Sequence, residues 1–390
     1  MKYLKLVGAI VFMTHINIPL ICLADIFPDA NFKIWLEKEK KKFNVPGISI
    51  ALVRDYKIVW TEGFGITNKQ TKKAVNASTL FQAASISKPV TALAGLKAVE
   101  QHKIRLDENI NDYLVAWKVS ENKWTRTNKV TLRRLLNHSA GINVPGFYGY
   151  QKGAEAPTLL EVLQGGTKVN SEPVRVLTTP GKHFKYSGGG YSIIQQALID
   201  VYKKPFPEVM NELVLIPLGM SNSTFVQPLP NSFIEKVAMP YRPNGQIVKG
   251  GPHTYIELAA AGLWTTSTDL AKFTIGLQES LRGNKNSILS IDAAKLMIEP
   301  SIDETMALGF FISDKYGNPA ARGTYFMHDG QNEGYRNKLI GSMKAGNGLI
   351  IMTNMSEDAK LLPKHKKQQT HYWAFINSIV HRIVDAEKWT

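Results

Sequence analysis

Apolar residues follow two different periods along this chain, and the change of period divides it into regions. Runs of apolar and β-branched residues with the length of strands lie near both ends, whereas helical spacing dominates from Ser85 to about Leu281. The predicted strands are 47–53, 57–65, 323–328, 335–343 and 348–354, and further helices are predicted at 31–43 and 370–386. This order predicts an α/β (α+β) fold: one antiparallel sheet built from both chain ends and flanked by helices, plus a largely helical inserted region.

The first residues have the features of a signal peptide. Lys2 and Lys5 precede an apolar stretch, and Ala24 supplies the small residue of a cleavage site before Asp25. Polar residues and Pro19 interrupt the apolar stretch, which argues against a permanent membrane span of about 20 residues. We therefore expect residues 1–24 to be removed and the protein to be periplasmic or secreted, although the sequence leaves open whether the segment stays as an anchor.

Composition excludes several classes of chemistry. The only cysteine is Cys22, so the mature chain would have no disulfide and no thiolate metal site. No His-Glu-x-x-His motif or other ligand cluster occurs, so neither a metal nor another cofactor is implied. The formal net charge is +15, but the excess is scattered and no nucleic-acid-binding motif accompanies it. Nucleic acid is therefore not an expected partner, and weak attraction to an anionic cell-envelope surface is the most that the charge suggests.

The strongest chemical pattern is Ser85-x-x-Lys88 at the start of a helical stretch. One turn of helix brings the lysine beside the serine hydroxyl, and the helix N-terminus stabilises negative charge on a nucleophilic oxygen. Pro89 fits this place, because proline is tolerated in the first helical turn. Ser120 begins the same four-residue pattern, but it lies in a polar stretch without an apolar period and is predicted to be a surface residue.

Two further motifs, Tyr186-Ser187-Gly188 and His328-Asp329-Gly330, follow in the same chain. With Ser85-x-x-Lys88 they resemble the ordered motifs of the penicillin-recognising serine hydrolases, specifically the class C β-lactamase-related branch in its His-x-Gly variant. That branch includes β-lactamases, D-alanyl carboxypeptidases, D-aminopeptidases and esterases. Further segments resemble family signatures: 46–51, 57–60, 104–108, 130–141, 217–220 and 261–270.

The resemblance implies a single β-lactamase-like catalytic domain over residues 25–390. Its sheet region would comprise about 25–80 and 301–390 and its helical region about 81–300, with the cleft between them. Ser85 would be the nucleophile, with Lys88 and Tyr186 as the proton-transfer groups. Which of the two is the acylation base stays open, although a nearby positive charge would favour the phenolate of Tyr186.

The remaining predicted site residues form the substrate and oxyanion side. The resemblance implies that the backbone N–H groups of Ser85 and Gln331 form the oxyanion hole. His328, Gly330, Ser187 and Gly188 complete the predicted substrate side. His138 and Arg336 are interpreted mainly as structural residues, although Arg336 at the cleft would suit a carboxylate.

Two departures from the family motifs bear on the substrate. Tyr186-Ser187-Gly188 lacks the amide of the usual Tyr-x-Asn, and His328 replaces the lysine of Lys-Thr-Gly. Each lost polar contact costs about 1–3 kcal/mol, which makes efficient β-lactam hydrolysis doubtful. The sequence therefore favours an exported serine hydrolase that acts on small ester, amide or peptide substrates. The alternatives are a true β-lactamase or D-alanyl-D-alanine carboxypeptidase or D-aminopeptidase, or a non-catalytic cell-envelope binding protein that retains the fold.

Overall fold

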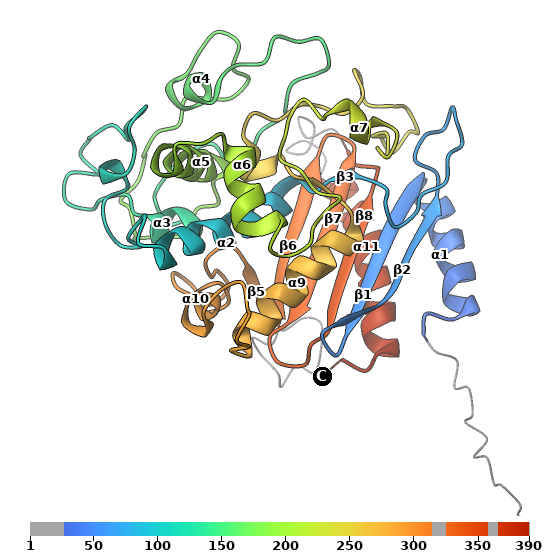
Figure 1. Ribbon diagram of the computed structural model, residues 1–390. Coiled ribbons are helices and arrows are strands. Elements are labelled where there is room, and N and C mark those ends of the chain that lie inside the picture. The colour runs from blue at the N-terminus through green and yellow to red at the C-terminus, as the bar shows by residue number, and fades with distance from the viewer. Residues whose placement is uncertain (1–26, 314–324, 358–365, 390) are drawn as a thin grey trace, which may run out of the picture.

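A six-stranded antiparallel sheet forms the centre of the protein (Figure 1). The computed structural model describes residues 27–313, 325–357 and 366–389, so the predicted signal peptide and Cys22 lie outside the described residues. The sheet order is β2-β1-β8-β7-β6-β5. Its strands are β1 (Gly47–Arg54), β2 (Lys57–Gly65), β5 (Phe311–Ser313), β6 (Tyr325–Asn332), β7 (Tyr335–Ser342) and β8 (Gly348–Thr353). Strand β1 pairs directly with β8, so the predicted sheet of two chain ends is confirmed.

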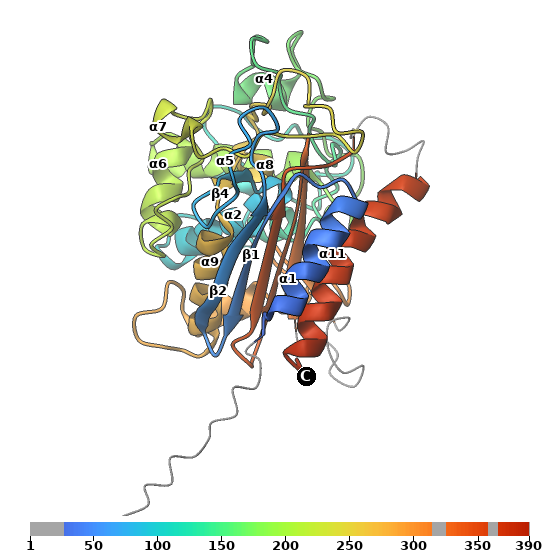
Figure 2. The ribbon, with the colours of Figure 1, turned by 90° about the vertical axis from the view of Figure 1, so that its right-hand side faces the viewer.

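Two helices from opposite ends of the chain cover one face of this sheet (Figure 2). Helix α1 (Ala30–Lys42) begins at the N-cap Asp29, whose carboxylate accepts the N–H of Phe32 at 2.7 Å, and it lies beside α11 (Lys366–Ala386). Alternate residues of β1 serve the two faces: Ile48, Ile50 and Leu52 join the core under these helices, and Ala51 and Val53 join the core on the other side. Burial on both faces explains the continuous apolar run of β1.

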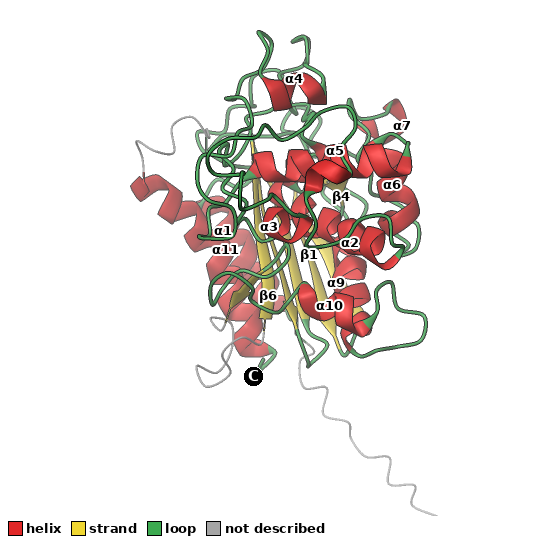
Figure 3. Cartoon of the chain, turned by 90° about the vertical axis from the view of Figure 1, so that its left-hand side faces the viewer, coloured by secondary structure: helices red, strands yellow, loops and turns green. Residues whose placement is uncertain are grey.

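The inserted helical region covers the other face (Figure 3). Helix α9 (Ser267–Leu281) lies against β1, β7 and β8, and Thr266 caps it by accepting the N–H of Asp269 at 3.1 Å. Further from the sheet lie α2 (Ser87–Glu100) and α5 (Gly188–Tyr202). The shorter elements are α3 (Leu132–Leu136), α4 (Leu159–Gln164), α6 (Phe206–Met210), α7 (Asn231–Ile234), α8 (Leu258–Ala261), α10 (Ile291–Leu296), β3 (Phe81–Gln82) and β4 (Trp264–Thr265).

The periodicity overstated how helical this region is. A single 3-10 turn, Ile110–Asp112, interrupts the irregular chain between α2 and α3, and residues 165–187 contain no helix. Polar side chains stabilise these segments instead, because they satisfy backbone groups that lack a helical or sheet partner. Asn122, for example, donates to the carbonyl of Val176 at 2.9 Å and accepts the N–H of Trp124 at 2.8 Å.

Candidate active site

Ser85 lies in a tight 3-10 turn, Ala84–Ile86, directly before α2 rather than at the first residue of that helix. Ala84 adopts a left-handed backbone conformation with φ of 54°, a strained geometry that recurs at functional sites. Ser87 fixes the turn, since its Oγ donates to the carbonyl of Ala84 at 2.6 Å and accepts the N–H of Leu263 at 3.0 Å. Lys88 follows one turn later, and its Nζ donates to Ser85 Oγ at 3.0 Å, as the spacing predicts.

Lys88 is almost completely buried, with 1% of its surface exposed. Its other partner is the carbonyl of Ala260 in α8, at 2.8 Å, and among the described residues no carboxylate forms an ion pair with it. Burial lowers its pKa to about 7, because the ammonium form loses its hydration. Near neutral pH a large share of Lys88 is therefore the free amine, which can accept a proton from Ser85.

Tyr186 completes this group, and its pKa is shifted in the direction opposite to the expected one. The Nζ of Lys88 lies 5.0 Å from the centroid of its ring, and its hydroxyl interacts with the side chain of Ser85. Burial raises the pKa of Tyr186 above its usual value, and this effect exceeds the lowering by the hydrogen bond with Ser85. The prediction that positive charge would favour the phenolate was wrong, because desolvation dominates. Tyr186 is a neutral phenol at pH 7.

The imidazole ring of His138 packs against the ring of Tyr186, and one ring nitrogen binds the backbone of the next residue, Ser187. The two ring centroids lie 4.3 Å apart, and Nδ1 of His138 accepts the N–H of Ser187 at 3.0 Å. Burial and the nearby Lys88 hold the pKa of His138 well below its ordinary value, so the ring stays neutral and Nδ1 remains an acceptor. The sequence interpretation of His138 as structural missed this contact with a predicted site residue.

The structure does not bring the side chain of Ser187 to the cleft. Ser187 is the N-cap of α5, where its Oγ accepts the N–H of Gly190 at 3.1 Å and donates to the carbonyl of Asn143 at 2.6 Å. Gly188 belongs to the first turn of α5. A Cβ on Gly188 would lie 3.0 Å from the ring of Phe147, which explains the need for a small residue there.

The predicted oxyanion strand is β6, and its free edge faces the nucleophile. The His328-Asp329-Gly330 segment lies within β6. Strand β5 pairs with residues 325–327, and among the described residues no strand pairs with this edge of β6 from His328 onward. Asn332 pairs with Tyr335 across the two-residue turn, and backbone groups in an antiparallel ladder face alternate sides, so the N–H of Gln331 points away from β7 toward this edge.

Glycine at position 330 permits the close approach of the strand to the nucleophile turn. A Cβ there would lie only 2.2 Å from the carbonyl oxygen of Ala83. The amide of Asn332 holds the same approach by donating to Gln82 Oε1 at 2.9 Å and to the carbonyl of Ala261 at 3.1 Å. Strand β6 and the turn that carries Ser85 are thus fixed against each other, which is the arrangement an oxyanion hole requires.

His328 lines the same site as a neutral imidazole. Its Nδ1 lies 2.6 Å from the carbonyl oxygen of Asp329, and burial together with the positive charge of Lys88 lowers its pKa to about 3. A histidine with this pKa carries no charge at neutral pH. It therefore does not replace the permanent cation of the family's Lys-Thr-Gly motif.

These residues line one cleft with a volume of about 200 Å³. Its walls are formed by Ser85, Tyr186, Phe311, His328, Asp329, Gly330, Gln331 and Trp373. The sequence interpretation assigned no role to Phe311 or Trp373, which come from β5 and α11. Ser120 is exposed, as predicted, and Arg336 is buried behind β6 in an ion pair with Glu357.

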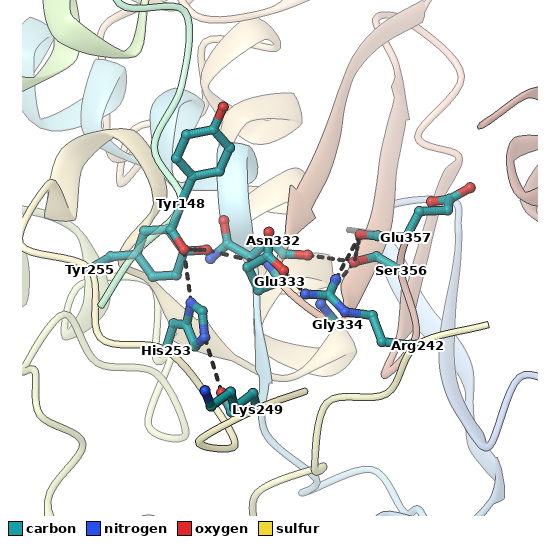
Figure 4. Close-up of polar contacts among 10 residues, drawn as sticks. All are labelled: Tyr148, Arg242, Lys249, His253, Tyr255, Asn332, Glu333, Gly334, Ser356 and Glu357. Atoms are coloured by element: carbon teal, nitrogen blue, oxygen red, sulfur yellow. Dashed lines mark hydrogen bonds and ion pairs between the residues drawn. The ribbon is translucent and has the colours of Figure 1, made fainter. Parts of the chain in front are cut away.

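A second group of charged residues lies around the tip of the β6–β7 hairpin, and we call it the paired-charge cluster: Arg242, Glu333, Arg336 and Glu357. Figure 4 shows Arg242, Glu333 and Glu357 of this cluster. Arg242 forms an ion pair with Glu333 and donates to the backbone carbonyl of Glu357 at 2.9 Å. Ser356 accepts the N–H of Gly334 at 2.8 Å and donates to the carbonyl of Asn332 at 2.7 Å. These contacts hold the hairpin that presents the N–H of Gln331.

The described residues contain no group of three or more His, Cys, Asp or Glu side chains suited to a metal ion. Within the same ranges, no helix has both the length and the apolar character needed to cross a membrane.

Comparison with known proteins gives a consistent assignment. A family model described as Beta-lactamase matches residues 35–371. Protein flp of Staphylococcus aureus (strain MW2) is 21% identical over 347 residues, which cover 86% of this chain but only 65% of that protein. The chain therefore spans slightly less than two thirds of this relative.

Two solved structures share the fold at low sequence identity. The octameric penicillin-binding protein homologue from Pyrococcus abyssi has a TM-score of 0.65 and 24% identity, over 84% of this chain and 73% of that chain. EstCE1, described as a hydrolase with promiscuous acyltransferase activity, has a TM-score of 0.67 and 19% identity, over 90% of this chain and 98% of that chain.

Proposed function

The chain belongs to the Beta-lactamase family, and from that premise we propose that it is a serine hydrolase that forms an acyl-enzyme on Ser85 with small ester or amide substrates. One observation carries the proposal. Lys88 is buried without a counter-ion among the described residues, and its Nζ lies 3.0 Å from Ser85 Oγ with a pKa of about 7. A buried amine next to a hydroxyl is an efficient general base near neutral pH.

The proposed reaction begins with proton transfer from Ser85 Oγ to the amine of Lys88 while Oγ attacks the substrate carbonyl carbon. The backbone N–H groups of Ser85 and Gln331 bind the oxyanion that forms. Tyr186, as a neutral phenol, gives its proton to the leaving alkoxide or amine and is reprotonated from Lys88. Water then attacks the acyl-enzyme with the same groups, releases the acid and restores the Ser85 hydroxyl.

Small esters suit the site better than penicillins or D-alanyl peptides. Gly188 stands where the family motif carries an amide, and Phe147 fills the space that a side chain there would need. His328 is neutral, so the site lacks the cation that pairs with a substrate carboxylate in Lys-Thr-Gly relatives. Steady-state rates for nitrocefin, a D-alanyl dipeptide and a short-chain p-nitrophenyl ester distinguish these functions. We expect the ester to be turned over fastest, and faster nitrocefin hydrolysis would favour a true β-lactamase.

Labelling with a fluorophosphonate probe tests the enzyme assignment itself. We expect the protein to be labelled and Ser85→Ala to abolish the label. Ser120→Ala is the matched control, because Ser120 is exposed and begins the same four-residue pattern. An unlabelled but folded wild-type protein would instead support a non-catalytic envelope-binding role.

We also propose export to the periplasm or the outside of the cell after removal of residues 1–24. N-terminal sequencing of the protein isolated from fractionated cells tests this, and a mature protein that starts at Asp25 is the expected result. Retention of Met1 in the cytoplasmic fraction would contradict it.

A further inference from the structure

The cleft continues past the nucleophile to the other side of strand β6. Ser85 and Tyr186 form one part of its wall, and Trp373 on α11 forms another. Along β6, His328 and Gly330 face the helical region, whereas Asp329 and Gln331 lie on the opposite face of the sheet, where α11 packs. A substrate at Ser85 can therefore extend across the edge of β6 toward Trp373.

The side-chain amide of Gln331 has a defined orientation on this second side. Its Oε1 accepts a hydrogen bond from Nη2 of Arg336 at 2.9 Å. A guanidinium group only donates, so the oxygen of Gln331 must face Arg336 and the NH2 group must face away. Among the described residues, Nε2 of Gln331 is buried and has no hydrogen-bond partner. A buried donor of this kind costs about 1–3 kcal/mol unless a ligand satisfies it.

The groups near this donor are the ring of Trp373 and charged side chains that are paired with opposite charges. Arg336 is paired with Glu357, and Lys338 Nζ lies 2.7 Å from Asp329 Oδ1. The ring of Trp373 lies 4.6 Å from the guanidinium carbon of Arg336 and 5.4 Å from Nζ of Lys338. Because each cation already has a carboxylate partner, the subsite fits a neutral oxygen acceptor better than an anion.

We propose that Gln331 is a specificity-determining residue whose side-chain NH2 binds a second, neutral carbonyl oxygen on the acyl group of the substrate. This inference rests on the proposed function. The acyl group is assigned to this side because Tyr186, the proposed donor to the leaving group, lies on the Lys88 side of the nucleophile. The preferred substrates are acyl donors with a ketone or amide carbonyl a few bonds from the scissile carbonyl. The cleft of about 200 Å³ has the volume of roughly six or seven waters at about 30 Å³ each, which suits a short acyl chain.

Two p-nitrophenyl esters that differ by one oxygen test the proposal: the pentanoate and the 4-oxopentanoate. The wild-type protein should prefer the 4-oxopentanoate in kcat/KM by about tenfold, the usual worth of one satisfied buried hydrogen bond. Gln331→Met keeps the length of the side chain but removes the donor, and should reduce this ratio to about 1. Gln331→Glu retains an acceptor for Arg336 without the donor and should lose the preference in the same way, which covers the case in which the methionine variant does not fold.

Gln164→Met is the control, because Gln164 is exposed on α4 and does not line the cleft. It should keep the wild-type ratio. An equal ratio in the wild type and both Gln331 variants would overturn the subsite while Ser85-dependent hydrolysis continued. A preference for the carboxylate-bearing succinate monoester, after subtraction of its spontaneous hydrolysis, would also overturn the neutral-acceptor assignment. If the wild-type protein shows no Ser85-dependent ester hydrolysis at all, that different result refutes the proposed function instead.

Discussion

One group of buried charge lies at the tip of the β6–β7 hairpin and another at the nucleophile, and they differ in how the charge is balanced. In the paired-charge cluster at the hairpin tip, Arg242 contacts Glu333 and Arg336 contacts Glu357. At the nucleophile, Lys88 is buried, and its Nζ donates hydrogen bonds only to the neutral oxygens of Ser85 and Ala260 among the described residues. Both groups are largely removed from water, but only the cations of the paired-charge cluster have carboxylates as partners.

This difference in counter-charges assigns a structural role to the paired-charge cluster and a proposed chemical role to Lys88. In a buried ion pair each charge has an opposite charge as its partner, so these pairs hold the shape of the hairpin tip. A buried cation without a counter-ion is easily neutralised, so its proton becomes available for transfer near pH 7. The same burial therefore stabilises a hairpin at one place and produces a base at the other. Each of the following predictions tests one side of this contrast.

The largest effect is expected for Lys88→Met. Loss of the proposed base should lower kcat by about 10²–10⁴-fold. The variant should nevertheless be more stable than the wild type at pH 7, because methionine needs no desolvation of charge. The folded-state pKa of about 7 lies below that of an unfolded lysine, so the wild-type penalty is full below pH 7 and fades as the pH rises toward 10. The difference in Tm between variant and wild type should shrink over this interval.

Lys97→Met is the control for Lys88→Met. Lys97 lies on the same helix, but its Nζ is 3.1 Å from a carboxylate oxygen of Glu100 and its side chain is partly exposed. Wild-type kcat and no pH-dependent gain in Tm are expected for it. A Lys88→Met variant that is less stable than the wild type at every pH would show that the lysine is held by compensating contacts and is not a strained base.

A smaller effect, on stability, is expected at the paired-charge cluster. Glu333→Gln leaves Arg242 without its carboxylate and should lower the free energy of unfolding by about 3 kcal/mol. Urea unfolding measures the change. The double substitution Glu333→Leu with Arg242→Met removes both charges and should recover much of the loss.

Glu155→Gln provides the matched surface pair, since Glu155 and Lys168 are both exposed. Its effect should stay within about 0.5 kcal/mol. If Glu333→Gln changes the free energy of unfolding as little as this control, the paired-charge cluster does not stabilise the hairpin. The proposed difference between the cluster and Lys88 would then be wrong for the cluster.

The smallest effect is expected on the midpoint of the pH–rate profile, which reports the group whose deprotonation activates the enzyme. The kcat/KM for an ester should rise with pH to a plateau, with a midpoint near 7 set by deprotonation of Lys88. His328 has a pKa of about 3 and is uncharged throughout this range. His328→Asn should therefore alter KM but leave the midpoint within about 0.3 pH units, as read from the pH–rate profile. A midpoint that disappears in this variant would identify His328 as the titrating group.

The sequence predicted the parts of the fold and site that depend on local pattern. Ser85 and Lys88 meet because residues three apart share a helical face, and β1 was recognisable from its apolar run. The start of α5 was also readable: Ser187 precedes a stretch with helical apolar spacing, which is typical of an N-cap. The three glycines concealed it, because glycine suits a loop as well as close packing, and at Gly188 the close neighbour is Phe147.

Features that depend on tertiary contacts were not predictable in this way. The protonation state of Tyr186 follows from desolvation, and sequence spacing does not report how much water a side chain loses. The contact between His138 and Tyr186 joins residues that no local motif connects. Trp373 lies on the apolar side of a helix, so its pattern was that of a core residue, and only the packing of α11 brings it to the cleft.

The pairing of β1 with β8 has a consequence for the timing of activity. The N–H of Gly47 binds Asn354 Oδ1, and these residues are 307 positions apart in the chain. A ribosome adding about 5–20 residues per second would need roughly a quarter of a minute to a minute between the two. For most of that interval the nucleophile turn is already synthesised, but β6, which carries the proposed second oxyanion donor, is not. Under the proposed function, a nascent chain that lacks β6 lacks half of its oxyanion hole, so we expect ester hydrolysis to begin only after β6 is in place.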